Sequence, residues 1–410
     1  MKNFLFFLFI LQIIFLSNIH SEEGVKDYLY YINLFVEKNY SIQAQQEKLN
    51  NARWNKISYL GNLLPQVSIN HIRTYNTEDG LNETGWNSTL SASQILFAGF
   101  SAINTLFMAG HLEGVEEFTL AYKKLQVSEQ AASLYFKCAS LYSQLESLNA
   151  AVSLMQQRVN ELKRRENLGK SRISEVYSAQ AKLAQLKSQL LQTQLDFENS
   201  LLEFENQCGE KPSSFIYPDE PMFSISDKQN IDDYISKYPY IKVMEQQLHY
   251  YESLSTIKKG SFLPTVSLLA NYNLVSSNYV SSGPTIKLMA NWEIFSGGSR
   301  LAEMIAYESL VTKAKYELED VKKTIKIQFN KVINNYRFSV LKLKELKSYY
   351  DFNQKNLKEQ QRDYLLGNVT NLEVLQAMMD LKDAKIAYDN GRVLAIQNEY
   401  ILKLWTGEIK

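Results

Sequence analysis

Apolar residues recur at alternating steps of three and four along much of the chain, which is the spacing of a coiled-coil seam. One seam occupies residues 138–162 and a second occupies 176–204. Leu168, Gly169 and Lys170 separate the two, and glycine readily adopts the left-handed conformation that ends many helices. The pattern predicts two long helices that fold back on each other at this break.

The C-terminal half carries the same pattern. One seam occupies residues 332–350, and another occupies 374–388. Leu366, Gly367 and Asn368 lie between them. A second helical hairpin is therefore predicted, with its glycine in the same place.

Four segments break the helical period and alternate between apolar and polar residues: 65–76, 85–97, 264–275 and 284–296. In the last of them, apolar residues at every second position oppose Thr285, Lys287, Asn291 and Glu293. Such alternation over about 10 residues is typical of membrane β-barrels, although an ordinary antiparallel sheet with one solvated face gives the same pattern. Four strands cannot close into a barrel, because an open edge in lipid leaves backbone groups unpaired. Strands in a membrane would therefore require copies of the chain to share one barrel.

The two halves match at a nearly constant offset. Leu-Pro-Gln-Val-Ser at 64–68 recurs as Leu-Pro-Thr-Val-Ser at 263–267, and Phe-Ala-Gly at 97–99 recurs as Phe-Ser-Gly at 295–297. Self-similarity at a fixed spacing indicates an internal duplication.

The duplication defines the predicted organisation of the chain: repeat 1 over 22–211, a linker over 212–227 and repeat 2 over 228–410. Repeat 1 is expected to contain a helix, the two strands, a long helix to about residue 165 and a helix over about 172–207. Repeat 2 is expected to contain a helix, its two strands, a long helix to about residue 365 and a helix over about 370–406.

The N-terminus has the order of an export signal. Lys2 precedes an apolar run from Phe4 to Leu16, and a polar stretch ends at Ser21. This order predicts a secretory signal peptide over residues 1–21. The alternative is a membrane anchor, but the apolar run is shorter than the roughly 20 residues that span a bilayer.

Composition and motifs narrow the function classes. The 44 lysines and arginines balance the 44 aspartates and glutamates, so no net field attracts nucleic acid. The four histidines lack metal-ligand spacing, and the chain has no Gly-rich phosphate loop, Gly-x-Ser-x-Gly elbow or Cys-x-x-Cys pair. We therefore expect no metal site, no cofactor, no nucleic-acid partner and no enzyme activity. Cys138 and Cys208 lie in helical patterns, where packing is favoured over a disulfide.

A specific order of landmarks remains: a Leu-Pro-Gln strand, a second strand ending in Leu-Phe-Ala-Gly or Ile-Phe-Ser-Gly-Gly, a long helix, a Leu-Gly break and a helix, twice over. This order resembles the TolC-like outer-membrane efflux proteins, the outer membrane factors, across essentially the whole mature chain. The resemblance implies a mixed α/β membrane protein that assembles as a homotrimer. Each chain would supply four strands to a shared twelve-stranded β-barrel in outer-membrane lipid, and long helical hairpins would form an α-barrel in the periplasm.

The resemblance also implies a function. Such a channel-tunnel passively conducts substrates to the exterior from a periplasmic adaptor, or membrane fusion, protein and an inner-membrane transporter, in multidrug efflux or type I secretion. The runner-up is a periplasmic coiled-coil adaptor or a structural protein without a pore, but an adaptor should carry one hairpin and compact β domains. A surface adhesin should carry long β-rich repeats, which the sequence lacks.

A periplasmic gate is implied at six positions: Tyr364, Glu373, Gln376, Ser174, Glu175 and Val369. Tyr364 stands where the family has a gating tyrosine, and Glu373 stands where it has a ring aspartate. Val369 replaces a linking arginine and Gln376 replaces a second ring aspartate, so the predicted closing network is weaker or differently connected. Three Glu373 carboxylates at a narrow mouth would attract cations, but an acid in the first turn also stabilises a helix N-terminus. Tyr364 has a simpler explanation as a packing residue.

Two further sets of residues follow from the resemblance. The helical breaks resemble the adaptor-contacting tips of the family: Leu168, Gly169, Lys170, Leu366, Gly367 and Asn368. Any helical hairpin, however, needs a glycine there. The polar face of the last strand would place Lys287, Asn291 and Glu293 in the barrel lumen.

Overall fold

The computed structural model describes residues 26–76, 82–212, 214–222, 231–276 and 283–409. Two compact units share these residues. Of the described residues, unit 1 comprises 26–39, 126–212, 214–222 and 332–409, and unit 2 comprises 40–76, 82–125, 231–276 and 283–331. The predicted signal peptide lies outside the described residues.

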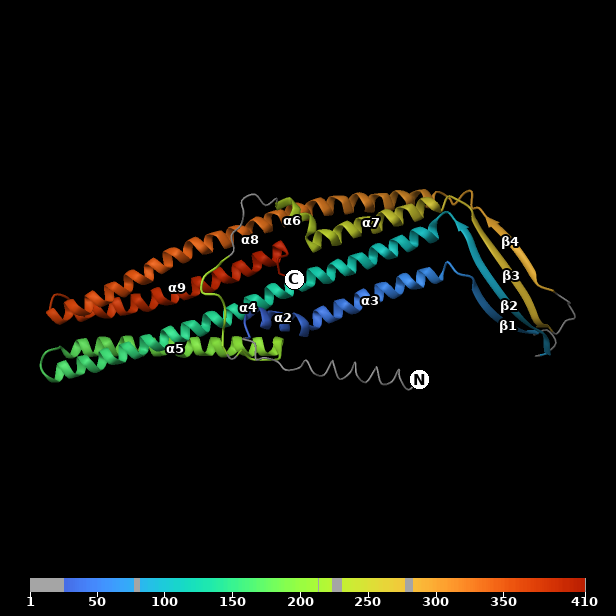
Figure 1. Ribbon diagram of the computed structural model, residues 1–410. Coiled ribbons are helices and arrows are strands. Elements are labelled where there is room, and N and C mark those ends of the chain that lie inside the picture. The colour runs from blue at the N-terminus through green and yellow to red at the C-terminus, as the bar shows by residue number, and fades with distance from the viewer. Residues whose placement is uncertain (1–25, 77–81, 213, 223–230, 277–282, 410) are drawn as a thin grey trace, which may run out of the picture. The chain divides into compact units, whose positions relative to one another are not determined.

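The order helix, helix, strand, strand, helix, helix occurs twice (Figure 1). The first set is α2 (Tyr28–Lys38), α3 (Tyr40–Gly61), β1 (Gln66–Asn76), β2 (Asn82–Ala98), α4 (Ser101–Asn167) and α5 (Ile173–Cys208). The second set is α6 (Ile231–Lys237), α7 (Pro239–Gly260), β3 (Thr265–Ser276), β4 (Thr285–Asn291), α8 (Ser299–Leu366) and α9 (Asn371–Thr406). None of these helices carries an apolar stretch long enough to cross a membrane.

The N-terminal helix predicted in each half is divided in two. Asn39 separates α2 from α3, and Tyr238 separates α6 from α7. Both residues have extended backbones, with ψ angles of 115° and 128°. Pro239 follows Tyr238, and proline disfavours a helical conformation in the residue before it.

The four strands of unit 2 form one antiparallel sheet in the order β1-β2-β3-β4 (Figure 1). Its register aligns residues of like polarity, because directly paired residues share a face. One row consists of Val67, Ala92, Ala270 and Ile286. The neighbouring row on the other face consists of Ser68, Ser91, Asn271 and Thr285. The alternation in sequence thus becomes one apolar and one polar sheet face.

β4 ends at Asn291, earlier than the predicted strand over 284–296. Its pairing with β3 stops there because Asn291 lies opposite Thr265, the first residue of β3. The chain after β4 makes other contacts. Arg300 donates to the carbonyl oxygen of Glu293, and Trp292 Nε1 donates to Phe262 O at 3.0 Å.

In unit 1, the ends of α4, α5, α8 and α9 pack around one apolar core (Figure 1). The core consists of residues from all four helices, including Met155, Leu162, Val176, Leu186, Leu357, Tyr364, Val374 and Met378. Most of the α4, α5 and α9 members lie in the predicted seams. The periodicity of three and four therefore reports the faces along which these helices pack.

Each hairpin turns at a left-handed glycine. Gly169 has a φ of +71° and Gly367 a φ of +77°. In both turns the glycine N–H and the following N–H donate to carbonyl oxygens of the last helical turn, at 2.8–3.2 Å. These bonds satisfy carbonyls that a helix end leaves unpaired.

The described part of the linker packs onto unit 1. Tyr135 Oη accepts from Ile216 N at 3.1 Å, and Arg392 Nη1 lies 3.1 Å from Asp219 Oδ1. Cys138 and Cys208 are both buried and free of a disulfide. Burial raises the pKa of each thiol to about 12, so both stay protonated at neutral pH.

Candidate functional site

Tyr364 lies near the C-terminal end of α8, in the four-helix core, with 8% of its surface exposed. Two guanidinium groups of α4 contact its ring. The Cζ atom of Arg158 lies 4.1 Å from the ring centroid, and that of Arg165 lies 4.9 Å away. Arginine over an aromatic face is attracted by the ring quadrupole, most strongly where water is excluded.

Arg158 is itself buried, with 7% of its surface exposed. Its Nε donates to Asn371 Oδ1 at 3.0 Å, and its Nη1 lies 2.8 Å from Glu161 Oε2. The other oxygen of Glu161 lies 3.7 Å from Arg165 Nη1. We call these five residues, Arg158, Glu161, Arg165, Tyr364 and Asn371, the arginine cluster.

Sequence reasoning missed four members of the arginine cluster. Three of them, Arg158, Glu161 and Arg165, are charged, and charged residues on long helices are usually solvated. One signal was available. Arg158 follows Met155 by three positions and precedes Leu162 by four, so it lies at the edge of the apolar seam. A charge at such a position is expected to need a partner from another helix.

Glu373 lies in the first turn of α9 and is exposed. Its Oε2 accepts from the Thr370 N–H at 2.6 Å and from the Thr370 hydroxyl at 2.8 Å. The backbone hydrogen bond and then the hydroxyl hold the pKa of this carboxyl below its usual range. Within one chain, Glu373 therefore belongs to a capping box.

The remaining predicted gate residues do not meet in one network in the described chain. Ser174 is exposed, and Glu175 accepts a hydrogen bond from Ser171. Gln376 donates to Asp380 Oδ1 at 2.7 Å along the surface of α9. Val369 is partly buried against the four-helix core.

The six predicted tip residues lie in the two hairpin turns and are exposed: Leu168, Gly169, Lys170, Leu366, Gly367 and Asn368. The leucine before each glycine is notable, because Leu168 is 70% exposed and Leu366 is 67% exposed. Each turn therefore presents an exposed leucine to its surroundings.

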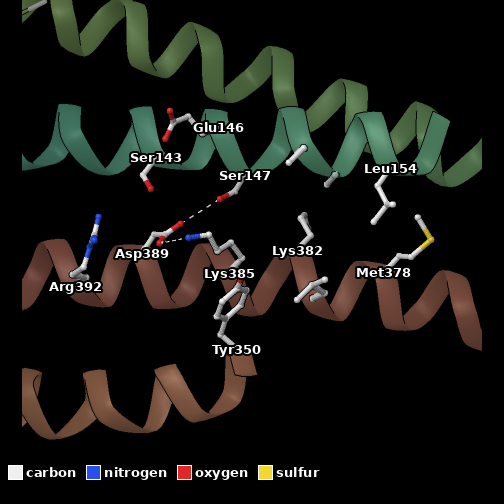
Figure 2. A pocket seen from close by; sticks show the side chains of 13 residues that line it. Ser143, Glu146, Ser147, Leu154, Tyr350, Met378, Lys382, Lys385, Asp389 and Arg392 are labelled. Carbon is white, nitrogen blue, oxygen red and sulfur yellow. Dashed lines mark hydrogen bonds and ion pairs between the residues drawn. The ribbon is translucent and has the colours of Figure 1, made fainter. Parts of the chain in front are cut away.

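A hollow of about 360 Å³ lies in unit 1, between α4 and α9 and beside Tyr350 of α8. Figure 2 shows the side chains that line it. Asp389 lies at one side, where it accepts from Lys385 at 2.7 Å and from the Ser147 hydroxyl at 3.3 Å. Lys382 is paired with Asp383 at 2.6 Å. Both ion pairs lie within α9, and the Ser147–Asp389 hydrogen bond joins α9 to α4.

The predicted lumen residues divide between strand and loop. Lys287 and Asn291 lie on the polar face of β4, and Lys287 is paired with Leu269 of β3. Glu293 lies beyond the end of β4, with its Oε2 3.8 Å from Arg300 Nε. On the same polar face, the Thr89 hydroxyl donates to Asn273 Oδ1 at 3.1 Å. In the described ranges, no group of three or more metal-ligating side chains is arranged to hold an ion.

No protein-family model and no curated protein match this chain in sequence. Solved structures do match its fold. CusC, described in a study of folding and transmembrane channel formation, has a TM-score of 0.84 and 15% identity over 95% of each chain. The outer membrane protein VceC of Vibrio cholerae has a TM-score of 0.80 and 16% identity, over 93% of this chain and 96% of its own.

The CmeC outer membrane channel of Campylobacter jejuni has a TM-score of 0.78 and 15% identity, over 94% of this chain and 88% of its own. These neighbours are outer membrane proteins and channels, not enzymes. The resemblance to the TolC-like outer-membrane efflux proteins is therefore confirmed at the level of the fold.

Proposed function

We propose that this chain is a subunit of an outer-membrane channel-tunnel, which passively conducts substrates that a periplasmic adaptor and an inner-membrane transporter deliver. The barrel would lie in outer-membrane lipid and the helices in the periplasm. The energy for transport would come from the transporter.

One observation carries the proposal: the four-stranded sheet has an apolar face that nothing in the described chain covers. Val67 of β1 is 66% exposed and Ile286 of β4 is 71% exposed. A sheet in water buries its apolar face against another layer. Lipid on the apolar side and water on the polar side would satisfy both faces of this sheet.

The open edges of the sheet support an oligomer. β1 and β4 are the outer strands, and neither has a second strand partner among the described residues. A membrane leaves no water to pair with the exposed backbone groups of an edge strand. Three copies, each supplying four strands, would close the twelve-stranded barrel that the resemblance implies. Lys287 and Asn291 would then line its lumen, with Glu293 at the rim.

The proposed gate lies in the hairpin ends of unit 1. Tyr364 and Glu373 would close it, with Ser174, Glu175, Val369 and Gln376 around them. The exposed tips at Leu168, Gly169, Lys170, Leu366, Gly367 and Asn368 would contact the adaptor.

The experiment is a planar-bilayer recording of the refolded mature chain, combined with its oligomeric mass in detergent. We expect discrete conductance steps from a trimer. A soluble, non-conducting species would overturn the proposal and favour a periplasmic adaptor without a pore.

Two variants test the positions assigned to the pathway. Glu373→Gln should reduce the preference for cations if three carboxylates surround the mouth. Lys287→Gln should increase that preference, because it removes a positive charge from the lumen. An unchanged selectivity would remove the corresponding residue from the pathway, and Lys211→Gln, outside both regions, is the control.

A further inference from the structure

We propose that Arg158 of α4 is a latch that holds the α8–α9 turn against the first hairpin. The inference rests on the proposed function for its link to gating, but its structural part stands on contacts within unit 1. Arg158 binds a side chain on each side of the turn: Tyr364 before it and Asn371 after it.

The contacts bracket the turn closely. Tyr364 is the third residue from the end of α8, and Asn371 is the first residue of α9. The intervening residues Leu366, Gly367 and Asn368 are exposed. Within the turn, Val369 is partly buried against the four-helix core. The polar and cation–π contacts of the turn with α4 come from its two flanking side chains, and one arginine makes both.

The geometry requires a guanidinium group. Arg158 places its guanidinium carbon over the Tyr364 ring, 4.1 Å from the ring centroid, while its Nε donates to Asn371. Lysine carries the same charge but has a single ammonium group, which cannot stack and donate sideways at once. Glu161 contacts both Arg158 and Arg165, so it offsets part of their charge and orients the two groups.

Two nitrogen donors of the arginine cluster lack a hydrogen-bond acceptor in the described chain, as expected for a latch that must open. Arg158 Nη2 and Arg165 Nε are buried and have no hydrogen-bond acceptor in the described parts of the chain. Buried donors without acceptors oppose the closed arrangement, and movement of the turn away from α4 would return them to water. Release therefore loses the ring contact and the Asn371 bond but recovers hydration of two donors.

The arginine cluster lies beside Val369, where this chain departs from the family pattern. The position that would carry a linking arginine is apolar in this chain, while two arginines of α4 contact the same turn from the other hairpin. We infer that opening of the helix ends requires Arg158 to release Tyr364 and Asn371.

The test compares Arg158→Lys with Arg164→Lys, which makes the same change at an exposed residue six positions along α4. Hydrogen exchange is followed by mass spectrometry in peptides over 365–372 and 168–174 of the full refolded protein, together with single-channel conductance. Arg158→Lys should speed exchange over 365–372 by about tenfold, as loss of a charged hydrogen bond predicts. Exchange over 168–174 should stay unchanged, and the open fraction of the channel should rise.

Asn371→Asp provides a change in the opposite direction, because a carboxylate strengthens the bond from Arg158. As a single substitution, Asn371→Asp should slow exchange over 365–372 relative to the parent. In the double variant with Arg158→Lys, most of this slowing should be lost. Unchanged exchange over 365–372 in Arg158→Lys, or an equal rise in Arg164→Lys, would overturn the latch. If the parent chain forms no channel, the proposed function fails, while the exchange data still decide whether Arg158 holds the turn.

Discussion

The two helical hairpins end in turns with closely similar backbones and different side-chain support. Each turn contains one left-handed glycine, Gly169 or Gly367, and returns two N–H groups to the preceding helix. In the first turn, Arg172 precedes α5 without a side-chain capping bond. In the second, Thr370 and Glu373 form a capping box, and α4 contacts both flanks.

The difference separates what sets the path of the backbone from what attaches the turn to a neighbouring helix. A glycine and a helix end are enough to set the path of the backbone, because the turn uses its own N–H and C=O groups. Attachment of the turn to a neighbouring helix needs side chains, and these differ between the halves. Tyr364 corresponds to Glu166 at the 198-residue offset that relates Gly367 to Gly169, and only Tyr364 joins the shared core.

The largest effect should come from removing this core side chain. Tyr364→Ala leaves a cavity among four helices and removes the ring that both arginines contact, so it should lower the free energy of unfolding by about 3–5 kcal/mol. Tyr364→Phe keeps the ring and should cost far less. Denaturant titration in detergent measures both changes at one protein concentration.

Glu166→Ala is the matched change in the first hairpin and should be nearly neutral, because its contribution to the turn is a backbone carbonyl. A comparable loss in Glu166→Ala and Tyr364→Ala would mean that the two hairpin ends are supported alike. The contrast drawn between them would then be wrong.

Substitution of either turn glycine should lower the free energy of unfolding by less than Tyr364→Ala does, and by the same amount at both positions. A Cβ at Gly169 or Gly367 would meet no atom within 4 Å, so only the positive φ opposes substitution. Gly169→Ala and Gly367→Ala should each lower the free energy of unfolding by roughly 1–2 kcal/mol. The same titration measures both, and unequal losses would show that the turns differ in backbone strain as well as in side chains.

A still smaller change in the free energy of unfolding is expected from the residues that precede α5 and α9. Thr370→Ala removes a hydroxyl bonded to Glu373 and should cost about 1 kcal/mol, the usual value for a helix N-cap. Arg172→Ala, at the equivalent N-cap of α5, removes no capping bond and should change the free energy of unfolding little. Amide exchange in the first turns of α5 and α9 locates each effect, and equal exchange changes would contradict the assignment.

Much of this fold could be predicted because its determinants are local and periodic. Leu162 and Val176 follow the seam spacing and lie in the four-helix core. Ser68 and Asn271 follow the strand alternation and share the polar sheet face. In both cases the period of the chain decides which side is buried or polar.

Other features depend on contacts between distant segments. β4 ends at Asn291 because β3 begins opposite it, which no pattern within 284–296 indicates. Arg158 meets Asn371 across 213 positions. The sequence indicated that Val369 departs from the family pattern, but it could not show which residue of another helix contacts that turn.

The smallest effect concerns acidity at the second turn. Hydrogen bonds from Thr370 lower the pKa of Glu373 below the usual 4.5, so the folded state favours its ionised form. The resulting stabilisation is fully present above the unfolded-state pKa and is lost as pH falls through the lowered folded-state pKa. The unfolding midpoints of the parent and Glu373→Gln should therefore differ by a constant amount above about pH 5 and converge in more acidic solution. A difference that stays constant down to about pH 3 would show that the Glu373 carboxylate is not what stabilises the start of α9, and would leave the cap to the Thr370 hydroxyl alone.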